Sequence, residues 1–409
     1  MTQLDLCVRN ARLLNDTDET VDIGVASQKI VTIGKSIPAA VEEYDAQGSI
    51  VLPGFVETHF HLDKACILER CSSKRGDLQE AIDEVARVKG DFTQEDVAQR
   101  ASRTLEKCVV NGTTRMRTHV EVDPTVGMHG YYGVKQAIAD YRWAIDVEIC
   151  VFPQEGLLNN PGTDELMVEA LRDGAKVVGA APYTDSSPHG QIDRVFEMAR
   201  EFDVDIDMHL DFGPDASALD LEYVCRKSDE FGWGGRVAIG HVTKLAQVEP
   251  VRLESLAKMM GDAGVALTVL PATDLFLMHR DHEHSVPRGV TPAHKLLEHG
   301  VNCSLSTNNV LNPFTPFGDC SLIRMANLYA NICQVGARES MVESLRMVSE
   351  RSAKLLNHDD YGVAAGNPAD LIVVNSSDPA MAVAELAQPV VGYKHGRRSF
   401  TRDLPRLHR

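Results

Sequence analysis

Two histidines stand at the end of an apolar run in the segment LPGFVETHFHLDKA, residues 52–65. His59 and His61 are two positions apart, so on an extended strand both imidazoles point to the same side. Neutral imidazoles bind Zn²⁺ or Fe²⁺ and leave coordination positions open. A further ligand must then come from another strand, and His209 and His241 are the candidates. Without these two, an ordinary pair of core or surface histidines would be an equally good interpretation.

Polar residues also stand at or just after the ends of eight short apolar or β-branched segments along the chain. Packing alone does not explain the pattern, and we expect these residues to form one site. The segments are 54–61, 113–120, 147–154, 176–183, 205–211, 236–242, 264–271 and 301–308. The polar residues at or just after their ends are His59 and His61, Thr118 and His119, Gln154, Tyr183 and Asp185, His209 and Asp211, His241, Asp274, and Thr307, Asn308 and Asn309.

Helical patterns separate these segments. In residues 92–112, Thr93 and Asp96 form a candidate capping box, apolar residues recur at every fourth position, and Asn111-Gly112 ends the helix. Eight strands alternating with helices over about 300 residues predict an α/β fold, a (β/α)8 TIM-like barrel, in which the carboxyl ends of the strands converge on one mouth. The alternative is a doubly wound open sheet, which normally carries a glycine-rich phosphate loop after its first strand. No such loop is visible.

Both ends of the chain instead alternate short β-like runs with turns. We expect residues 1–53 and 362–409 to fold together as a small β-sandwich domain, with residues 54–361 as the barrel.

Composition limits the class of protein. Hydrophobic residues make up 44% of the 409 and charged residues 24%, as in a soluble globular protein. We expect a cytoplasmic location and no membrane contact, because no apolar stretch approaches about 20 residues and the first residues do not resemble a signal peptide. The nine cysteines form no CxxC pair, which predicts reduced thiols. A net charge of −18 opposes nucleic acid as a partner.

Taken together, the motifs resemble the amidohydrolase superfamily, and particularly its cytosine deaminase-like branch, which includes the hydrolase of N-isopropylammelide. The segments that carry the resemblance are DIGV…KIVTIG…LPGFVETHFHLDK, RTHVEVD, VFPQEG, DIDMHLD, GRVAIGHVTK, RGVTPAHKLLEHGVN and YGVAAGNPADLIVVN, which span nearly the whole chain.

The resemblance implies a hydrolase that holds one divalent metal ion, Zn or Fe. By position, His59, His61 and His209 match the imidazole ligands, His241 matches a histidine near the reacting water, and Gln154 matches a glutamine that hydrogen-bonds the heterocyclic ring. Some related barrels bridge two ions with a carboxylated lysine at the end of strand four, but here Lys176 stands at its start, which favours one ion. Relatives are commonly multimeric, so we expect a homo-oligomer.

The sequence departs from this family at two positions. Asn308 replaces the strand-eight aspartate, and an amide oxygen can ligate a metal but cannot accept a proton as a carboxylate does. Phe212 replaces the glutamate that protonates the ring in cytosine deaminases. Asp211, two residues after His209, would face the mouth on an extended strand and act as general base or acid. The alternative is that Asp211 only orients His241 or Lys64.

We therefore expect water, whose pKa the metal lowers from about 16 towards about 7, to attack an sp² carbon of a small nitrogen heterocycle. His241 would stabilise the tetrahedral intermediate and Asp211 would deliver a proton, in a deamination or a cyclic C–N hydrolysis. Alternatives are displacement of sulfide, as in a thiohydantoin-type desulfhydrase, or of halide. Asn308 also leaves open a non-catalytic binding protein, and a further alternative treats all the histidines as core residues.

The loop after the seventh strand, TDLFLMHRDHEHSVPRG, is rich in cationic residues. Arg280, His282, His284 and Arg288 predict a cationic group at the mouth, suited to a substrate carboxylate. A second metal site formed by His279, His282 and His284 is the alternative. We expect Gln154, His119, Asn309, Phe212, Arg280 and His282 to contact the substrate. The simplest interpretation of Lys64 is a lysine on the surface.

Overall fold

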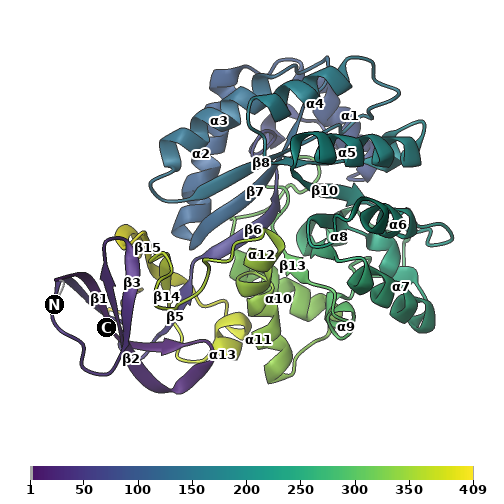
Figure 1. Ribbon diagram of the computed structural model, residues 1–409. Helices are drawn as coiled ribbons and strands as arrows, with labels where there is room; N and C mark the ends of the chain where they lie inside the picture. Colours follow the sequence, from purple (N-terminus) through teal and green to yellow (C-terminus); the bar gives the residue numbers. More distant parts are fainter. Residues whose placement is uncertain (1–2, 409) are drawn as a thin grey trace.

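A parallel barrel forms the larger part of the computed structural model, which describes residues 3–408 (Figure 1). The eight strands β6 to β13 pair in sequence order, each parallel to the next. The ring closes where the Asn308 N–H donates to the His59 carbonyl (3.1 Å) and the His61 N–H donates to the Asn308 carbonyl (3.0 Å). The predicted (β/α)8 barrel is confirmed, and every predicted segment overlaps one strand: β6 Phe55–Phe60, β7 Thr113–Glu121, β8 Asp146–Phe152, β9 Val177–Val178, β10 Asp205–Leu210, β11 Val237–His241, β12 Val265–Val269 and β13 Cys303–Leu305.

Helices follow the strands and surround the barrel (Figure 1). They are α1 Leu78–Lys89, α2 Gln94–Val110, α3 His129–Tyr141, α4 Thr163–Arg172, α5 Pro188–Phe202, α6 Leu221–Phe231, α7 Pro250–Asp262, α8 Pro271–Leu277, α9 Ala293–Leu297, α10 Leu322–Cys333, α11 Arg338–Arg346, α12 Glu350–Leu355 and α13 Pro379–Ala384, with 3-10 turns at Leu68–Arg70, Pro182–Thr184 and Thr243–Gln247.

Helix α2 shows how local sequence sets these boundaries. Thr93 caps it by accepting a hydrogen bond from the Asp96 N–H at 3.2 Å. The reciprocal half of the predicted capping box is absent, because the Asp96 carboxylate instead accepts hydrogen bonds from Arg70 and Arg100. The helix ends at Asn111, and Gly112 follows with a φ of +90° that glycine adopts without strain.

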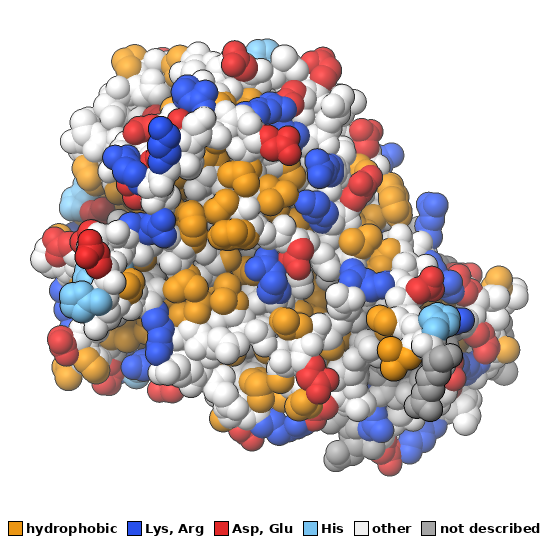
Figure 2. Space-filling view, turned by 180° about the vertical axis from the view of Figure 1, so that it is seen from behind, with side chains coloured by type: hydrophobic (Ala, Val, Ile, Leu, Met, Phe, Trp, Pro, Cys, Tyr) orange, Lys and Arg blue, Asp and Glu red, His pale blue; other side chains and the backbone are white. Residues whose placement is uncertain are grey.

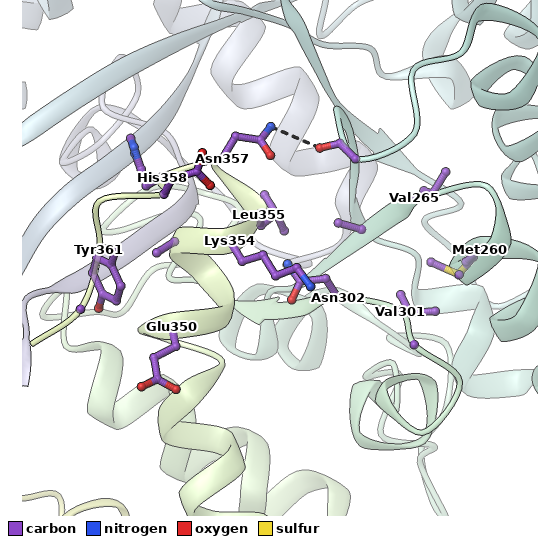
Figure 3. A pocket seen from close by; sticks show the side chains of 18 residues that line it. Met260, Val265, Val301, Asn302, Glu350, Lys354, Leu355, Asn357, His358 and Tyr361 are labelled. Atoms are coloured by element: carbon purple, nitrogen blue, oxygen red, sulfur yellow. Dashed lines mark hydrogen bonds between the residues drawn. The ribbon is translucent and has the colours of Figure 1, made fainter. Parts of the chain in front are cut away.

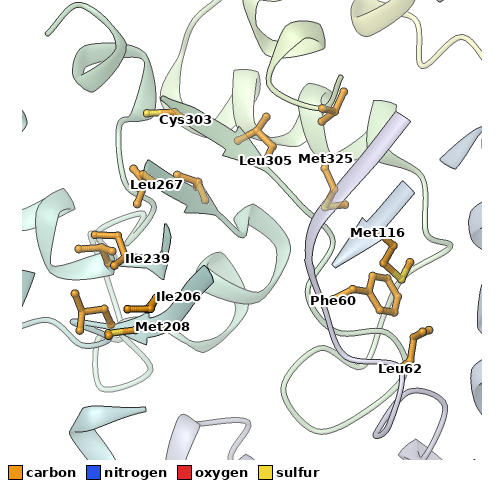
Figure 4. Close-up of a cluster of buried hydrophobic side chains, with 14 of the residues drawn as sticks. Phe60, Leu62, Met116, Ile206, Met208, Ile239, Leu267, Cys303, Leu305 and Met325 are labelled. Carbon is orange, nitrogen blue, oxygen red and sulfur yellow. The ribbon is translucent and has the colours of Figure 1, made fainter. Parts of the chain in front are cut away.

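The main core lies between the strands and the helices. Apolar side chains of successive strands, including Phe60, Met208, Leu267 and Leu305, point outward from the barrel into this layer (Figure 4). Burial of one such side chain contributes about 1.5–3 kcal/mol to folding. Because Phe60 faces outward, its neighbours His59 and His61 face inward.

The two ends of the chain form a second, mostly antiparallel sheet (Figure 1). The N–H of Ile30 donates to the Asn367 carbonyl and that of Ala369 to the Gln28 carbonyl, each at 2.9 Å, so the sheet folds back around its own apolar core. The smaller domain built from both termini is thus confirmed, whereas the division at residues 53 and 362 stays a prediction. The strands are β1 Leu4–Leu13, β2 Asp16–Ala26, β3 Lys29–Gly34, β4 Ala40–Asp45, β5 Ile50–Pro53, β14 Leu371–Val374, β15 Pro389–Lys394 and β16 Arg397–Thr401.

Acidic and basic side chains are interspersed over the surface shown in Figure 2, with apolar side chains gathered across the middle of the larger part. Within residues 3–408, no helix is long and apolar enough to cross a membrane. All nine cysteines are free thiols. The cytoplasmic location and the homo-oligomer remain predictions.

Candidate active site

Three imidazoles meet inside the barrel at the carboxyl ends of β6 and β10. The Nε2 atom of His209 lies 3.0 Å from Nε2 of His59 and 3.1 Å from Nε2 of His61. All three rings are buried. Burial holds the pKa of each imidazole well below its usual value, and protonation of one ring would also be opposed by a charge on the next, so all three are neutral at pH 7.

This donor set fits a divalent cation better than it fits hydrogen bonds. Nε2 of a neutral His209 either donates or accepts one hydrogen bond, so it satisfies only one of its two neighbours. A cation accepts all three lone pairs, and imidazole nitrogens bind Zn²⁺ at about 2.0–2.1 Å. Asn308 lines the same cavity as His61 and His209, and its Oδ1 is buried without a hydrogen-bond partner. The structure therefore brings together the four residues predicted as metal ligands, whose role stays a prediction.

His119 lies behind His59. Their rings stack with centroids 3.7 Å apart, and His119 is fully buried and does not line the cavity. Ring nitrogens of His59, His119 and His209 lie within 4.8 Å of one another, which makes His119 an alternative to His61 as a ligand. Only His61 of these two faces the cavity. The expected contact between His119 and substrate is corrected, because its ring is covered by His59 and directed towards Asp207.

Asp207 is a buried carboxylate that the sequence interpretation did not select. Its Oδ1 lies 3.5 Å from Nδ1 of His59 and 3.4 Å from Nε2 of His119, and Arg117 donates to its Oδ2 at 3.0 Å. Burial alone would raise the pKa of Asp207, but its interactions with His119, His59 and Arg117 hold that pKa well below the usual range. A carboxylate facing Nδ1 keeps the proton of His59 there and leaves Nε2 free to bind a metal.

Asp274 supports His241 in the same way. Nδ1 of His241 lies 2.6 Å from Oδ1 of Asp274, and Asp274 is fully buried. Burial raises the pKa of Asp274, while the bond to His241 opposes this rise. His241 therefore presents Nε2 to the cavity, which it lines. Although the sequence placed Asp274 after the seventh strand, nothing in it linked this residue to one 33 positions earlier.

Asp211 does not point into the mouth, and that expectation is corrected. Strand β10 ends at Leu210, and Asp211 has a φ of +47°, so the alternation of an extended strand stops before it. Its carboxylate accepts the N–H groups of Asp220 (3.0 Å) and Leu221 (2.9 Å) at the start of α6 and lies 3.4 Å from Nζ of Lys244. Burial raises the pKa of Asp211, but these partners satisfy its oxygens. The general acid or base role predicted for it lacks geometric support.

The cavity beside the imidazoles is small, at about 10 Å³. Gln154 lines it, with Nε2 buried and unpartnered, while its Oε1 accepts a hydrogen bond from Nζ of Lys64 at 3.1 Å. Lys64 is therefore not a surface lysine but a buried one, paired with Glu121. Lys64 fixes the orientation of the amide and leaves its N–H donors facing the cavity.

The other predicted substrate contacts, and the remaining cationic residues of the loop after α8, lie in different places. Phe212 lines the cavity and meets the ring of His241 edge-on, with centroids 5.1 Å apart. Asn309 lines both this cavity and a neighbouring one, which also contains Arg280. His282 is exposed and paired with Asp281, because the loop after α8 turns outward. Arg288 lines a separate cavity, so the predicted cationic group does not assemble.

The second metal site predicted as an alternative has a different composition from that expected. The group consists of His279, Asp281 and His282, on the outward-turning loop, and His284 is not part of it.

A cavity of about 550 Å³ lies at the opposite end of the barrel (Figure 3). Val265 and Val301, at or before the amino ends of β12 and β13, line it together with Asn357 and His358. None of the predicted site residues does so. The chemistry therefore belongs to the smaller cavity at the carboxyl ends.

Known proteins share both the sequence and the fold. N-isopropylammelide isopropyl amidohydrolase of Pseudomonas sp. (strain ADP) is 27% identical over 402 residues, covering 96% of each chain. Pterin deaminase of Rhizobium rhizogenes is 26% identical, covering 87% of this chain and 82% of its own. The crystal structure of 5-methylcytosine deaminase from Klebsiella pneumoniae, liganded with 5-fluorocytosine, superposes with a TM-score of 0.94 at 26% identity, covering 98% of this chain and 99% of that one. The profile of the Amidohydrolase family matches residues 94–400, and the chain therefore belongs to the amidohydrolase family.

Proposed function

We propose that this protein is a metal-dependent hydrolase that acts on a small nitrogen heterocycle. The observation that carries the proposal is the convergence of three neutral imidazoles beside the His241–Asp274 pair, around one cavity at the carboxyl ends of the barrel strands that His61, His209 and His241 line. The names of the related proteins, which act on ammelide, pterin and cytosine rings, support the substrate class.

His59, His61, His209 and Asn308 would hold the metal ion, Zn or Fe. When bound, this ion lowers the pKa of water from about 16 towards about 7 and so supplies a nucleophile at neutral pH. Burial keeps the three imidazoles unprotonated, which leaves their lone pairs available to the ion.

The remaining residues bind the ring and move protons. Nε2 of Gln154 donates to an acceptor on the ring, and Lys64 holds the amide in that orientation. His241 accepts a proton at Nε2, and Asp274 stabilises the imidazolium that results. Phe212, Leu277 and Phe314 line the cavity and exclude bulk water, which strengthens these electrostatic interactions.

In a second candidate function, the same site hydrolyses a heterocycle that releases sulfide or halide in place of ammonia or an amine. It is favoured by the residues that line the cavity, because none of those described is Asp or Glu. A leaving group that needs no proton requires less help from a carboxylic acid than an amine does.

The test is a screen of the metal-loaded protein against cytosine, pterin, N-isopropylammelide, 2-thiohydantoin and a chlorotriazine, with separate assays for ammonia, amine, sulfide and chloride. We expect about one metal ion per chain and release of one of these products. His59→Asn should lose both metal and turnover, whereas His189→Asn, which alters an exposed histidine on α5, should lose neither. Stoichiometric metal without any product across the screen would favour the non-catalytic alternative, and absence of metal would favour core histidines.

A further inference from the structure

A second cavity adjoins the one that holds the imidazoles. Its volume is about 410 Å³, within the range of about 300–1,000 Å³ typical of small-molecule sites. It lies beside the end of β13, between α8 and α10. Thr307 lines this cavity and the next residue, Asn308, lines the first, so the chain running on from β13 separates the two.

Side chains complete the wall between the cavities on either side of this segment. Asn309 lines both cavities, and its Oδ1 accepts a hydrogen bond from Nδ2 of Asn312 at 2.6 Å. Thr273 lines the first cavity and Thr315 the second, and their hydroxyl groups are hydrogen-bonded at 2.7 Å. The two cavities are therefore separated by the segment after β13 and by two side-chain hydrogen bonds, none of which belongs to a barrel strand.

The larger cavity has an apolar body. Leu275 and Phe276 of α8 form one side, and Leu328 of α10 and Phe317 form another. The rings of Phe276 and Phe317 meet edge-on, with centroids 6.0 Å apart. These walls suit an alkyl or aryl group and offer it no hydrogen-bonding partner.

Two arginines give the same cavity a positive charge. Arg324 donates from Nε to Asp319 at 2.8 Å, and Arg280 donates from Nη2 to the Arg75 carbonyl at 2.8 Å and lies over the Phe276 ring. A guanidinium has five N–H donors, so both groups keep donors for a further partner. None of the described residues lining the cavity is Asp or Glu. This contrasts with a chain of net charge −18.

Two carboxylates lie near these arginines. Asp319 is hydrogen-bonded to Arg324, and Glu57 lies behind Thr307, whose hydroxyl and N–H donate to it. Arg280 is hydrogen-bonded to a carbonyl instead, so its positive charge faces the cavity without a carboxylate bonded to it among the described residues.

We propose that the second cavity holds a substituent of the substrate, with an apolar body and a terminal carboxylate bound by Arg280 and Arg324. The inference rests on the proposed function, because the heterocyclic ring must then reach the imidazoles at the first cavity. That cavity, at about 10 Å³, has room for about one water molecule, so the ring enters it only when the two cavities are joined. The substrate class becomes a nitrogen heterocycle with a carboxylated alkyl or aryl arm. Arginine suits this role since its planar donors match a carboxylate.

A binding experiment tests the cavity without relying on turnover. Dansylglycine and dansylamide share an apolar fluorophore, but only dansylglycine carries a carboxylate. We expect dansylglycine to bind the holoenzyme at least about tenfold more tightly, and Arg280→Gln and Arg324→Gln each to remove most of this preference. Arg288→Gln, which lies in another cavity, is the matched control and should retain it. Equal affinities for the two probes, or a preference that survives both arginine substitutions, would overturn the assignment.

A kinetic experiment tests the link to the first cavity. N-(ω-carboxyalkyl)ammelides with two to six methylene groups are compared with N-alkylammelides of the same length. We expect one chain length to give at least a tenfold higher kcat/KM than its neutral counterpart, and this ratio to fall towards one in Arg324→Gln but not in Arg288→Gln. Turnover of the neutral compounds with no such ratio at any length would refute this inference alone. Absence of turnover of any heterocycle would refute the proposed function, and dansylglycine binding would then still decide the cavity.

Discussion

Asp207 is expected to set the metal affinity of the site, although its carboxylate is not a proposed ligand. It lies 3.5 Å from Nδ1 of His59 and accepts a hydrogen bond from Arg117 at 3.0 Å. In Asp207→Asn, the amide oxygen can face either Arg117 or His59, but not both. If the oxygen faces Arg117, the NH₂ group faces Nδ1 of His59 and favours the tautomer with a proton on Nε2. If the oxygen faces His59, the NH₂ group meets the N–H donors of Arg117.

Loss of such a carboxylate typically weakens metal binding about 10–100-fold, or about 1.4–2.8 kcal/mol. Because the separation from His59 is at the long end of hydrogen-bonding range, we expect the lower part of this interval. The assay is competition for Zn²⁺ with a chromophoric chelator at pH 7.5. Thermal unfolding of the apoprotein checks that Arg117, which keeps Glu148 as a partner at 2.7 Å, still allows folding.

Asp274→Asn is the matched control, since Asp274 contacts His241, outside the proposed ligands. We expect its zinc affinity to match that of the unaltered protein. A folded Asp207→Asn protein whose zinc affinity stays within about threefold of that of the unaltered protein would refute the reasoning.

Three further outcomes are expected. Asp274→Asn should lower kcat/KM by about 10–100-fold, for the substrate that the screen identifies, while the metal content stays constant. The reason is that a charge-assisted hydrogen bond contributes about 1.5–3 kcal/mol. An unchanged kcat/KM would exclude a role for the His241–Asp274 pair. Asn308→Ala should weaken zinc binding by about tenfold or more, an effect of about 1.4 kcal/mol, in the same competition assay; full affinity would show that its oxygen is not a ligand. Burial lowers the pKa of His358 to about 4 from its ordinary 6.5, so this group stabilises the fold above pH 6.5 and the stabilisation is lost as pH falls from 6.5 through 4. His358→Gln should therefore lose less stability than the unaltered protein between pH 7 and 4.5, by about 1–2 kcal/mol after allowance for partial exposure, in denaturant titrations at each pH; parallel losses would contradict the shifted pKa.

The barrel was predictable because each strand carries a local signal. Its strands are short apolar or β-branched runs, and the separating helices have caps and stops such as Thr93 and Asn111-Gly112. The pairing of His59 with His61 also follows from a local rule, since residues two apart share one face of a strand. The convergence of both on His209 follows from the fold, because strand ends of a barrel meet at one mouth.

What failed was the extension of strand geometry past the last residue of a strand. Asp211 is one position beyond β10, and its positive φ turns the carboxylate onto α6. The loop that carries His282 and Arg288 failed for a related reason. Its cationic composition predicts charge, but composition does not determine direction, and the loop turns His282 to solvent and Arg288 to another cavity.

The contacts by which carboxylates hold the histidines in place were harder to predict from the sequence. Asp207 shares a strand face with His209, so its spacing could have identified it. The residues that it contacts, Arg117 and His59, belong to other strands. Asp274 lies in the first turn of α8, after β12, and contacts His241 at the end of the neighbouring strand β11. Such contacts depend on the register of neighbouring strands, which a single sequence does not specify.

These carboxylates also change where proton transfer is to be sought. The family resemblance implies a strand-eight aspartate as the base, and this chain has Asn308 there. Since the described residues that line the cavity include no carboxylic acid, a proton leaving the nucleophile must go to a nitrogen base. His241 is the histidine in that lining whose ring is held by a buried carboxylate at 2.6 Å, and this partner stabilises the charge that the proton would bring. The replacement at strand eight is therefore compatible with hydrolysis, provided that the His241–Asp274 pair carries the proton.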